Sequence, residues 1–308
     1  MWLAACAAHG DPPPTATPPV VPTQTPAPWS PDPQSFIPSG ARIANTMYVD
    51  SDGGGLSEWV VIYQDRGAGR GLVIRREGEG GRTYPLGGAP PAALFQQGWI
   101  ATTVRDINGD GQIEIMVSGA NRDGGQSINV FQWDGQTYAS LLSLTGEKGV
   151  AIDDAENKGI YDFTALQLLF PRAAIIRTTH AEWRQSAYQQ TSDVLFLLGS
   201  PIALSTPEEV TLAYYTYLRR GQTEQAFALL GEPQKLLTPL DALAALSREL
   251  DGASVETMEV VEESSSRAVV SLSVRTATSA AGQVIRLYVW HLQKENQRWV
   301  LWALTAPP

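Results

Sequence analysis

Cysteine, histidine and basic residues are scarce in this chain of 308 residues. Its single cysteine excludes an internal disulfide framework and a cysteine-rich zinc site. Lysine and arginine number 22 against 32 aspartates and glutamates, which gives a net charge of −10. This acidic balance provides no electrostatic footprint for nucleic acid and no basic patch for an anionic membrane surface. No apolar run reaches the roughly 18 residues that a membrane-spanning helix needs.

Motifs of the common enzyme classes are also missing. The chain contains no GxSxG nucleophile elbow, no HExxH zinc motif and no GxxxxGK or GxGxxG phosphate loop. Its three histidines, His9, His180 and His291, stand far apart in the sequence. No histidine-based metal site is indicated, and the sequence favours a protein without catalytic activity.

The composition nevertheless supports folded domains. Hydrophobic residues make up 43% of the chain and aromatic residues 8%, enough to fill cores and to exclude wholesale disorder. At roughly 100–200 residues per domain, the length predicts two domains. Changes in composition predict a short N-terminal segment over 1–10, a linker over 11–38, an all-β repeat domain over 39–200 and an α+β domain over 203–308.

The lone cysteine closes the short sequence Leu3-Ala4-Ala5-Cys6. A leucine and two small residues before a cysteine resemble the lipobox of bacterial lipoproteins. The resemblance implies that the chain is cut before Cys6, that the thiol carries a diacylglycerol, and that acyl chains anchor the protein to the cell envelope, outside the cytoplasm. A lipoprotein leader has a basic start and roughly 7–15 apolar residues, so we expect further coding sequence upstream of Met1. The alternative is a functionless thiol in a frayed end.

Proline dominates residues 11–38, where eleven of 28 residues are proline and none is lysine or arginine. Proline fixes φ and removes a hydrogen-bond donor, so we expect an extended, semi-rigid spacer without a core. A ligand for proline-binding domains and an O-glycosylated stalk are the alternatives. A tether requires only the observed composition and is preferred.

An aspartate- and glycine-rich loop recurs at intervals of roughly 50 residues between about residues 42 and 200. The clearest copy, DINGDGQIE, starts at Asp106; the first copy, DSDGGGLSE, starts at Asp50; a weaker copy starts at Asp154. Each loop precedes an apolar run, and the run after the clearest copy alternates like a β-strand. About twenty residues after the second and third loops, two aromatic residues stand five positions apart. They are Trp133 and Tyr138 in the second copy and Trp183 and Tyr188 in the third, and Tyr84 is their single counterpart in the first copy.

The loop spacing suits a hard cation. Ca²⁺ takes six to eight oxygen ligands at about 2.3–2.6 Å. Side chains at loop positions 1, 3, 5 and 9 and the backbone carbonyl of position 7 converge when glycine at position 6 permits a sharp turn. In the clearest copy these positions hold Asp106, Asn108, Asp110, Gln112 and Glu114. In the first copy the weaker ligand set is Asp50, Asp52, Leu56 and Glu58, with Gly54 where position 5 needs a ligand. The third copy has Lys158 at position 5, so an acidic turn without an ion is preferred there.

This pattern resembles the FG-GAP/VCBS repeat of β-propellers, whose blades include calcium loops. An EF-hand is rejected because position 12 is Val117 rather than glutamate and the flanks read as strands. Closed propellers typically need roughly four to eight four-stranded blades, and this region provides about three. We therefore expect an incomplete, propeller-like β domain whose open sheet edges are covered, with the second domain as a candidate cover.

The C-terminal region reads as helices followed by an antiparallel sheet, an α+β fold. A capping box at Thr206 with proline next to it starts the first helix, and Gly221 ends it. Further helices are predicted over 223–230 and 239–250. Strands are predicted around 269–274, 285–292 and 299–304. The segments TPEEVTLAYYTYLRRGQTEQAFALLGEP and RWVLWAL resemble the nuclear transport factor 2-like superfamily, which implies a cone-shaped domain with a pocket.

Some members of that superfamily are isomerases or dehydratases, so the pocket defines an alternative function. Its candidate groups are Asp241 as base, Tyr214 or Tyr288 as oxyanion donor, and His291. No spacing motif ties them together. An enclosed apolar cavity with one uncompensated carboxylate would support a small-ligand carrier or enzyme, whereas a filled cone would support a binding module.

The sequence thus predicts a lipid-anchored, extracytoplasmic protein of the bacterial envelope that is stabilised by Ca²⁺. It would bind or scaffold an envelope protein or a polysaccharide without catalysing a reaction. Contact with the membrane is expected only through the lipid anchor, and no contact with nucleic acid is expected.

Overall fold

The computed structural model describes residues 29, 31–78, 80–89, 91–96, 100–154, 159–197, 202–276 and 284–305. The predicted lipobox with Cys6 and most of the linker lie outside these residues. The chain divides into a unit from Met1 to Pro31 and a compact unit from Asp32 to Pro308. The second unit begins with a short 3₁₀ helix, η1 (Pro33–Phe36).

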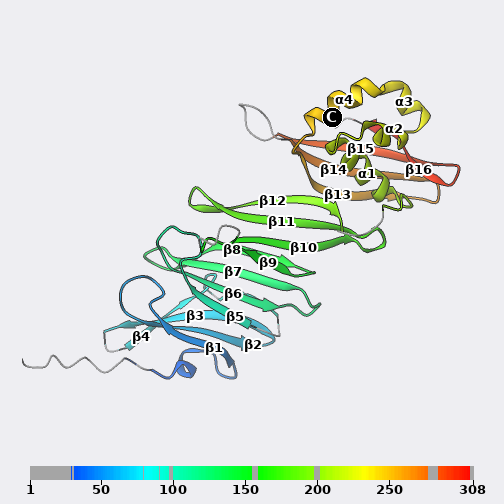
Figure 1. Ribbon diagram of the computed structural model, residues 1–308. Helices are drawn as coiled ribbons and strands as arrows, with labels where there is room; N and C mark the ends of the chain where they lie inside the picture. Colours follow the sequence, from blue (N-terminus) through cyan, green and yellow to red (C-terminus); the bar gives the residue numbers. More distant parts are fainter. Residues whose placement is uncertain are drawn as a thin grey trace, which may run out of the picture. The chain divides into compact units, whose positions relative to one another are not determined.

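Four antiparallel sheets of four strands each dominate the described residues, and within each sheet neighbouring strands are consecutive in sequence (Figure 1). Sheet one contains β1 (Arg42–Val49), β2 (Glu58–Asp65), β3 (Ala68–Glu77) and β4 (Gly80–Pro85). Sheet two contains β5 (Ile100–Arg105), β6 (Glu114–Ala120), β7 (Gln126–Trp133) and β8 (Tyr138–Gly146). Sheet three contains β9 (Val150–Asp153), β10 (Asp162–Phe170), β11 (Ile175–Arg184) and β12 (Ala187–Phe196). Sheet four contains β13 (Ser254–Glu263), β14 (Arg267–Thr276), β15 (Val284–Glu295) and β16 (Arg298–Thr305).

Hydrophobic clusters lie between successive sheets of the first three. Sheets one and two share a cluster that includes Val60, Ile62, Val73, Phe95, Ile115, Val117 and Phe131. Sheets two and three share a cluster that includes Met116, Ile128, Val130, Leu142, Phe163 and Tyr188. Each of these three sheets contains one of the aspartate- and glycine-rich loops of the sequence. Within the described ranges, no closure of these sheets into a ring is shown.

Strand β6 is buried on both faces. Ile115 and Val117 belong to the cluster shared with sheet one, while Met116, on the opposite face, belongs to the cluster shared with sheet three. The alternation in the sequence would suit a strand with one solvent-exposed face. Because β6 packs between two sheets, neither face is exposed, and Glu114 at the start of the strand is buried.

In the residues that the structure describes, the α-helices follow sheet three. They are α1 (Pro207–Arg219), α2 (Thr223–Ala228), α3 (Glu232–Leu237) and α4 (Leu240–Glu249), with a short 3₁₀ turn, η2 (Pro171–Ala173), between β10 and β11. The predicted capping box is confirmed, because Thr206 Oγ1 accepts from the Glu209 N–H and the Glu209 carboxylate accepts from the Thr206 N–H. Helix α3 and strand β13 were not predicted, although Pro233 near the start of α3 is a helix-start signal. In the described part of the chain, no helix has the length and apolar character to cross a membrane.

Sheet three and the helical region share a third core. Its members include Ala173, Ile175 and Val194 together with Val210, Leu218, Leu250 and Val255. The Arg172 guanidinium pairs with both carboxylate oxygens of buried Glu208, at 2.5 and 3.0 Å. The Asp193 carboxylate accepts from Arg219, at 2.9 and 3.1 Å, and from the Val255 N–H at 2.8 Å. The edge strand β12 therefore lies beside β13, and the C-terminal region covers it.

Candidate cation site

The three predicted loops occupy the same place in their sheets, between the first and second strand. In each sheet the residue before the loop pairs directly with the residue after it. These pairs are Val49 with Glu58, Arg105 with Glu114, and Asp153 with Asp162. Loop position 9 is consequently the first residue of the second strand in all three sheets.

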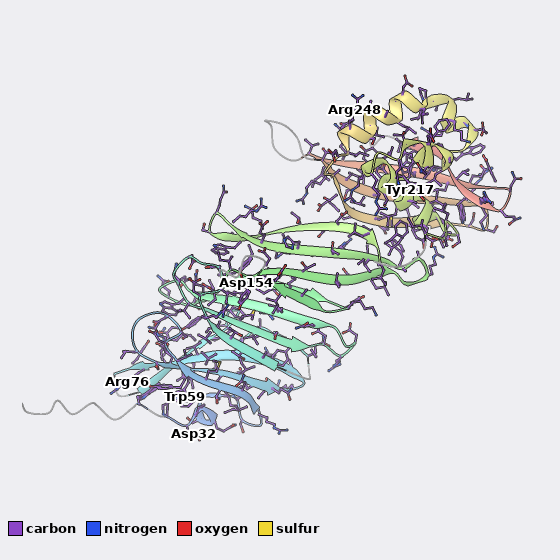
Figure 2. All side chains as sticks on the ribbon, viewed as in Figure 1. Asp32, Trp59, Arg76, Asp154, Tyr217 and Arg248 are labelled. Atoms are coloured by element: carbon purple, nitrogen blue, oxygen red, sulfur yellow. The ribbon has the colours of Figure 1, made fainter. Side chains whose placement is uncertain are left out.

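A shared hydrogen bond shapes the three loops. The N–H of the glycine at position 6 donates to the aspartate at position 1, at 2.8 Å in loop one, 3.0 Å in loop two and 2.9 Å in loop three. These glycines have positive φ angles of 81°, 84° and 76°, a backbone conformation that residues other than glycine rarely adopt. The donor and acceptor pairs are Gly55 and Asp50, Gly111 and Asp106, and Gly159 and Asp154, the last labelled in Figure 2.

Position 9 of loops one and two is a buried glutamate. Glu58 Oε2 accepts from the Ser51 N–H and Glu114 Oε2 accepts from the Ile107 N–H, both at 2.8 Å. Burial raises the pKa of the Glu58 carboxyl, and it raises the pKa of Glu114 to about 7. The negative charges of Asp110 and Asp106 add to this rise at Glu114. Both carboxyl groups are thus desolvated and lie beside other acids.

Loop two joins three of its five predicted ligand residues, Asn108, Asp110 and Glu114, in one side-chain network. Asn108 Nδ2 donates to Asp110 Oδ2 at 3.2 Å, and the side-chain Oδ1 of Asn108 accepts from the Asp110 N–H at 2.9 Å. Asp106 Oδ1 accepts from the Gly109 N–H at 2.7 Å. Gln132, on the neighbouring strand β7, donates to Asp110 Oδ2 at 2.9 Å and to Glu114 Oε1 at 2.7 Å. Gln112, the fifth, is exposed and binds Asp110 through its backbone N–H.

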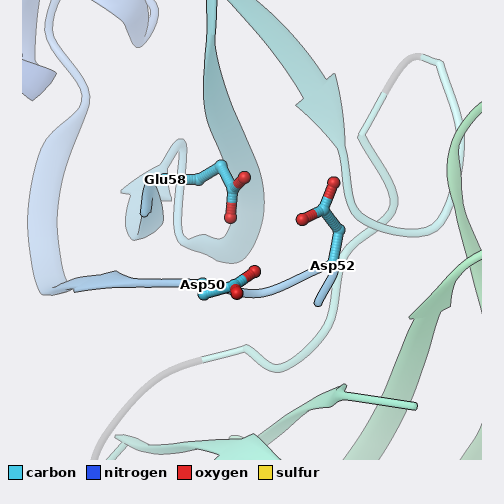
Figure 3. A group of neighbouring side chains, drawn as sticks. All are labelled: Asp50, Asp52 and Glu58. Atoms are coloured by element: carbon cyan, nitrogen blue, oxygen red, sulfur yellow. The ribbon is translucent and has the colours of Figure 1, made fainter. Parts of the chain in front are cut away.

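In loop one three carboxylate oxygens lie close together, and an arginine side chain supplies a positive charge beside them. Ligand oxygens of Asp50, Asp52 and Glu58 all lie within 4.8 Å of one another (Figure 3). The Arg75 guanidinium hydrogen-bonds Asp52 Oδ2 and lies 4.0 Å from Glu58 Oε1. Asp50 Oδ1 is buried and has no hydrogen-bond partner. The Leu56 side chain is exposed, and this residue was predicted to contribute only its backbone carbonyl.

The recurring tyrosine of each following sheet faces the loop of the sheet before it. Tyr138 of sheet two shares a 2.7 Å hydrogen bond with Ser51 Oγ, which also contacts Glu58 at 3.0 Å. In loop two the residue equivalent to Ser51 is Ile107. The hydroxyl of Tyr188 in sheet three is buried without a hydrogen-bond partner. Burial raises the pKa of Tyr188, and Glu114 is the charged group that adds most to this rise.

Loop three has an aspartate, rather than a glutamate, at position 9. Burial and the charge of Glu182 raise the pKa of Asp162 at its position 9. Asp154 at position 1 accepts from the Gly159 N–H. Lys158, predicted at position 5, lies outside the described residues.

The catalytic candidates of the C-terminal region are not brought together. Asp241 is exposed in the first turn of α4, and His291 is exposed and hydrogen-bonds Thr305 at 2.9 Å. Tyr214 is buried between Tyr215 and Trp290, with ring centroids 5.3 and 5.2 Å apart. A groove of about 640 Å³ on sheet four is open to solvent; it is lined by Glu263, Arg267, His291 and Trp302, among others.

The sequence did not point to three residues around the loops: Arg75, Gln132 and Tyr188. Gln132 pairs with Glu114 across β6 and β7, so strand register could have placed it once the sheets were known. Tyr188 was noticed as part of an aromatic repeat, but its contact with the preceding loop depends on how the sheets stack.

No family model matches the chain, and no curated protein matches it. A SEC-C motif containing protein from Rhodopseudomonas palustris is similar in structure, with 16% identity and a TM-score of 0.30, over 34% of this chain and 81% of that one. An Ntf2 like protein involved in plasmid conjugation is also similar, with 8% identity and a TM-score of 0.21, over 68% of this chain and 76% of that one. Because both TM-scores are low, neither likeness carries an argument about function.

Proposed function

We propose that the chain is a lipid-anchored, extracytoplasmic binding or scaffolding protein of the bacterial envelope, without catalytic activity. Sheets one to three are propeller-like blades of the FG-GAP/VCBS type, and residues 203–308 form a cone-shaped domain like that of nuclear transport factor 2. One Ca²⁺ ion bound in loop two stabilises the repeat region. The partner is an envelope protein or polysaccharide, and Cys6 provides the membrane contact.

The observation that carries the calcium proposal is the buried hydroxyl of Tyr188. Tyr188 is 8% exposed, and its hydroxyl has no hydrogen-bond partner. A buried polar group without a partner costs about 1–3 kcal/mol. A cation in loop two, with the water molecules that Ca²⁺ usually retains, would give this hydroxyl a partner.

The charge of loop two supports the same ion. Asp106, Asp110 and Glu114 carry three carboxylates, and the neighbouring Gln132 is neutral. Burial disfavours the ionised form of Glu114, and the negative charges of Asp110 and Asp106 add to this effect on its pKa. A divalent cation would offset that repulsion, and carboxylate and amide oxygens are the ligands that Ca²⁺ prefers.

The filled interior of the C-terminal region favours binding over catalysis. Tyr214, Tyr215 and Trp290 are all buried, and Trp290 Nε1 donates to the Tyr215 hydroxyl at 3.1 Å. These side chains occupy the space between α1 and sheet four that a substrate would need. Asp241, the candidate base, is exposed on α4 rather than buried in that interior.

Calorimetric titration of the metal-free protein with Ca²⁺ tests the proposal. We expect one ion per chain for the wild type and none for Asp106→Asn. The matched control is Asp154→Asn, which changes the same position of loop three and should keep the wild-type stoichiometry. Absence of heat with millimolar Ca²⁺, together with an unchanged melting temperature, would refute calcium binding.

The anchor is tested separately. In bacterial cells that express the gene with its upstream sequence, a palmitate analogue should label the wild type and not Cys6→Ser. Equal labelling of the two would remove the lipoprotein proposal and leave the calcium proposal intact.

A further inference from the structure

The residue next to position 9, on the third strand of each sheet, differs between loops one and two. In sheet two, Gln132 pairs directly with Glu114. In sheet one, Trp59 pairs with Ile74, so Glu58 and Arg75 are the next residues along the two antiparallel strands. The same position thus presents a neutral amide to loop two and a guanidinium to loop one.

Arg75 is held in loop one by charge and by aromatic rings. Its guanidinium hydrogen-bonds Asp52 and lies 4.0 Å from a Glu58 oxygen. The guanidinium carbon lies 4.2 Å from the centre of the Trp133 ring and 5.7 Å from that of Tyr84. A cation over an aromatic face gains further attraction, most strongly with tryptophan. Because Trp133 belongs to sheet two, these contacts also connect the first two sheets.

We propose that Arg75 is the built-in cation of loop one and that the residue at this position decides whether a loop takes a metal ion. Arg75 brings one positive charge to the three carboxyl groups of loop one without any ion. Gln132 brings none to loop two, where a bound Ca²⁺ would supply positive charge. This inference rests on the proposed calcium binding of loop two only for its second half.

Exchanging the two residues tests the inference on the full chain with Ca²⁺ alone as probe. Arg75→Gln gives loop one the residue of loop two, and we expect one additional bound ion per chain. The added ion should bind more weakly than the ion of loop two, because Gly54 supplies no side-chain ligand. Arg75→Lys keeps the positive charge and should retain the wild-type stoichiometry. An Arg75→Gln protein that folds and gains no ion overturns the role of Arg75.

The reverse exchange covers the case in which Arg75→Gln fails to fold. Gln132→Arg places a guanidinium in loop two and should lower its calcium affinity at least tenfold; an unchanged affinity overturns the inference. The double variant Arg75→Gln/Asp106→Asn separates this inference from the proposed function. If the wild type binds no calcium and the double variant binds one ion, the calcium proposal fails and the role of Arg75 stands. If the wild type binds one ion and the double variant binds none, the role of Arg75 fails and the calcium proposal stands.

Discussion

Glu114 makes the stability of the folded chain depend on pH. Its carboxyl group is fully buried, and its pKa of about 7 lies above the 4.5 expected in an unfolded chain. Between these two values the folded protein retains a proton that the unfolded chain has lost. In metal-free buffer, the free energy of unfolding should therefore fall as the pH rises from 4.5 to 7.

The expected fall is at most about 3 kcal/mol, at roughly 1.4 kcal/mol per pKa unit. Urea unfolding in EDTA at several pH values between 4.5 and 8 measures it. Glu58 and Asp162 have pKa values raised in the same direction, so Glu114→Gln is the control that isolates the share of Glu114. Saturating Ca²⁺ should flatten the dependence, because the ion favours the ionised carboxylate. A wild-type profile as steep as that of Glu114→Gln would contradict the role given to this residue.

Tyr138 and Tyr188 form a matched pair at the residue scale. Tyr138 hydrogen-bonds Ser51, whereas the Tyr188 hydroxyl has no partner. Tyr138→Phe should lower the free energy of unfolding by about 1 kcal/mol, and Tyr188→Phe should leave it unchanged or raise it in EDTA. Both variants keep the aromatic contacts with their tryptophans. Equal losses in urea unfolding would argue against the difference between the two hydroxyls.

At the scale of elements, the contact between sheets one and two depends on a glycine. A Cβ atom added to Gly119 of β6 would lie 2.4 Å from Phe95 Cγ, and the same ring also covers Gly69 of β3. Overpacking of this kind typically costs about 1–3 kcal/mol or more. Gly119→Ala should therefore lower the free energy of unfolding. Gly80→Ala, where the added atom lies at an ordinary van der Waals distance of 3.9 Å from the Glu77 carbonyl oxygen, should not. Thermal unfolding of both variants decides the point, and similar melting temperatures would contradict it.

For the whole molecule, the continuous cores predict cooperative unfolding. Sheet three contributes to two clusters, one shared with sheet two and one shared with the helical region. Asp193 and Glu208 add buried or partly buried ion pairs to the second contact. Calorimetric heating of the protein should show one main transition for residues 32–308. Asp193→Asn should lower its midpoint by leaving Arg219 unpaired, and two well-separated transitions in the wild type would contradict the shared core.

The sequence alone was sufficient for features that depend on neighbours in the chain. The Asp-to-Gly spacing of the loops, the capping box at Thr206 and the alternation before Ser118 rest on local geometry, since turns, caps and strands use contacts a few residues apart. The division into three repeats and a helical region followed from these signals. Ordinary local rules did not reveal α3 and β13, which are stabilised by their tertiary neighbours.

Only the tertiary structure decided which groups meet at the loops. Ser51 and Tyr138 are 87 residues apart, and Arg75 reaches Asp52 across 23 residues. Those contacts depend on strand register and on the stacking of one sheet against the next, and spacing within the chain specifies neither. The burial that raises the pKa of Glu114 is a consequence of that stacking, whereas the Arg75 guanidinium reaches loop one through the strand register of sheet one.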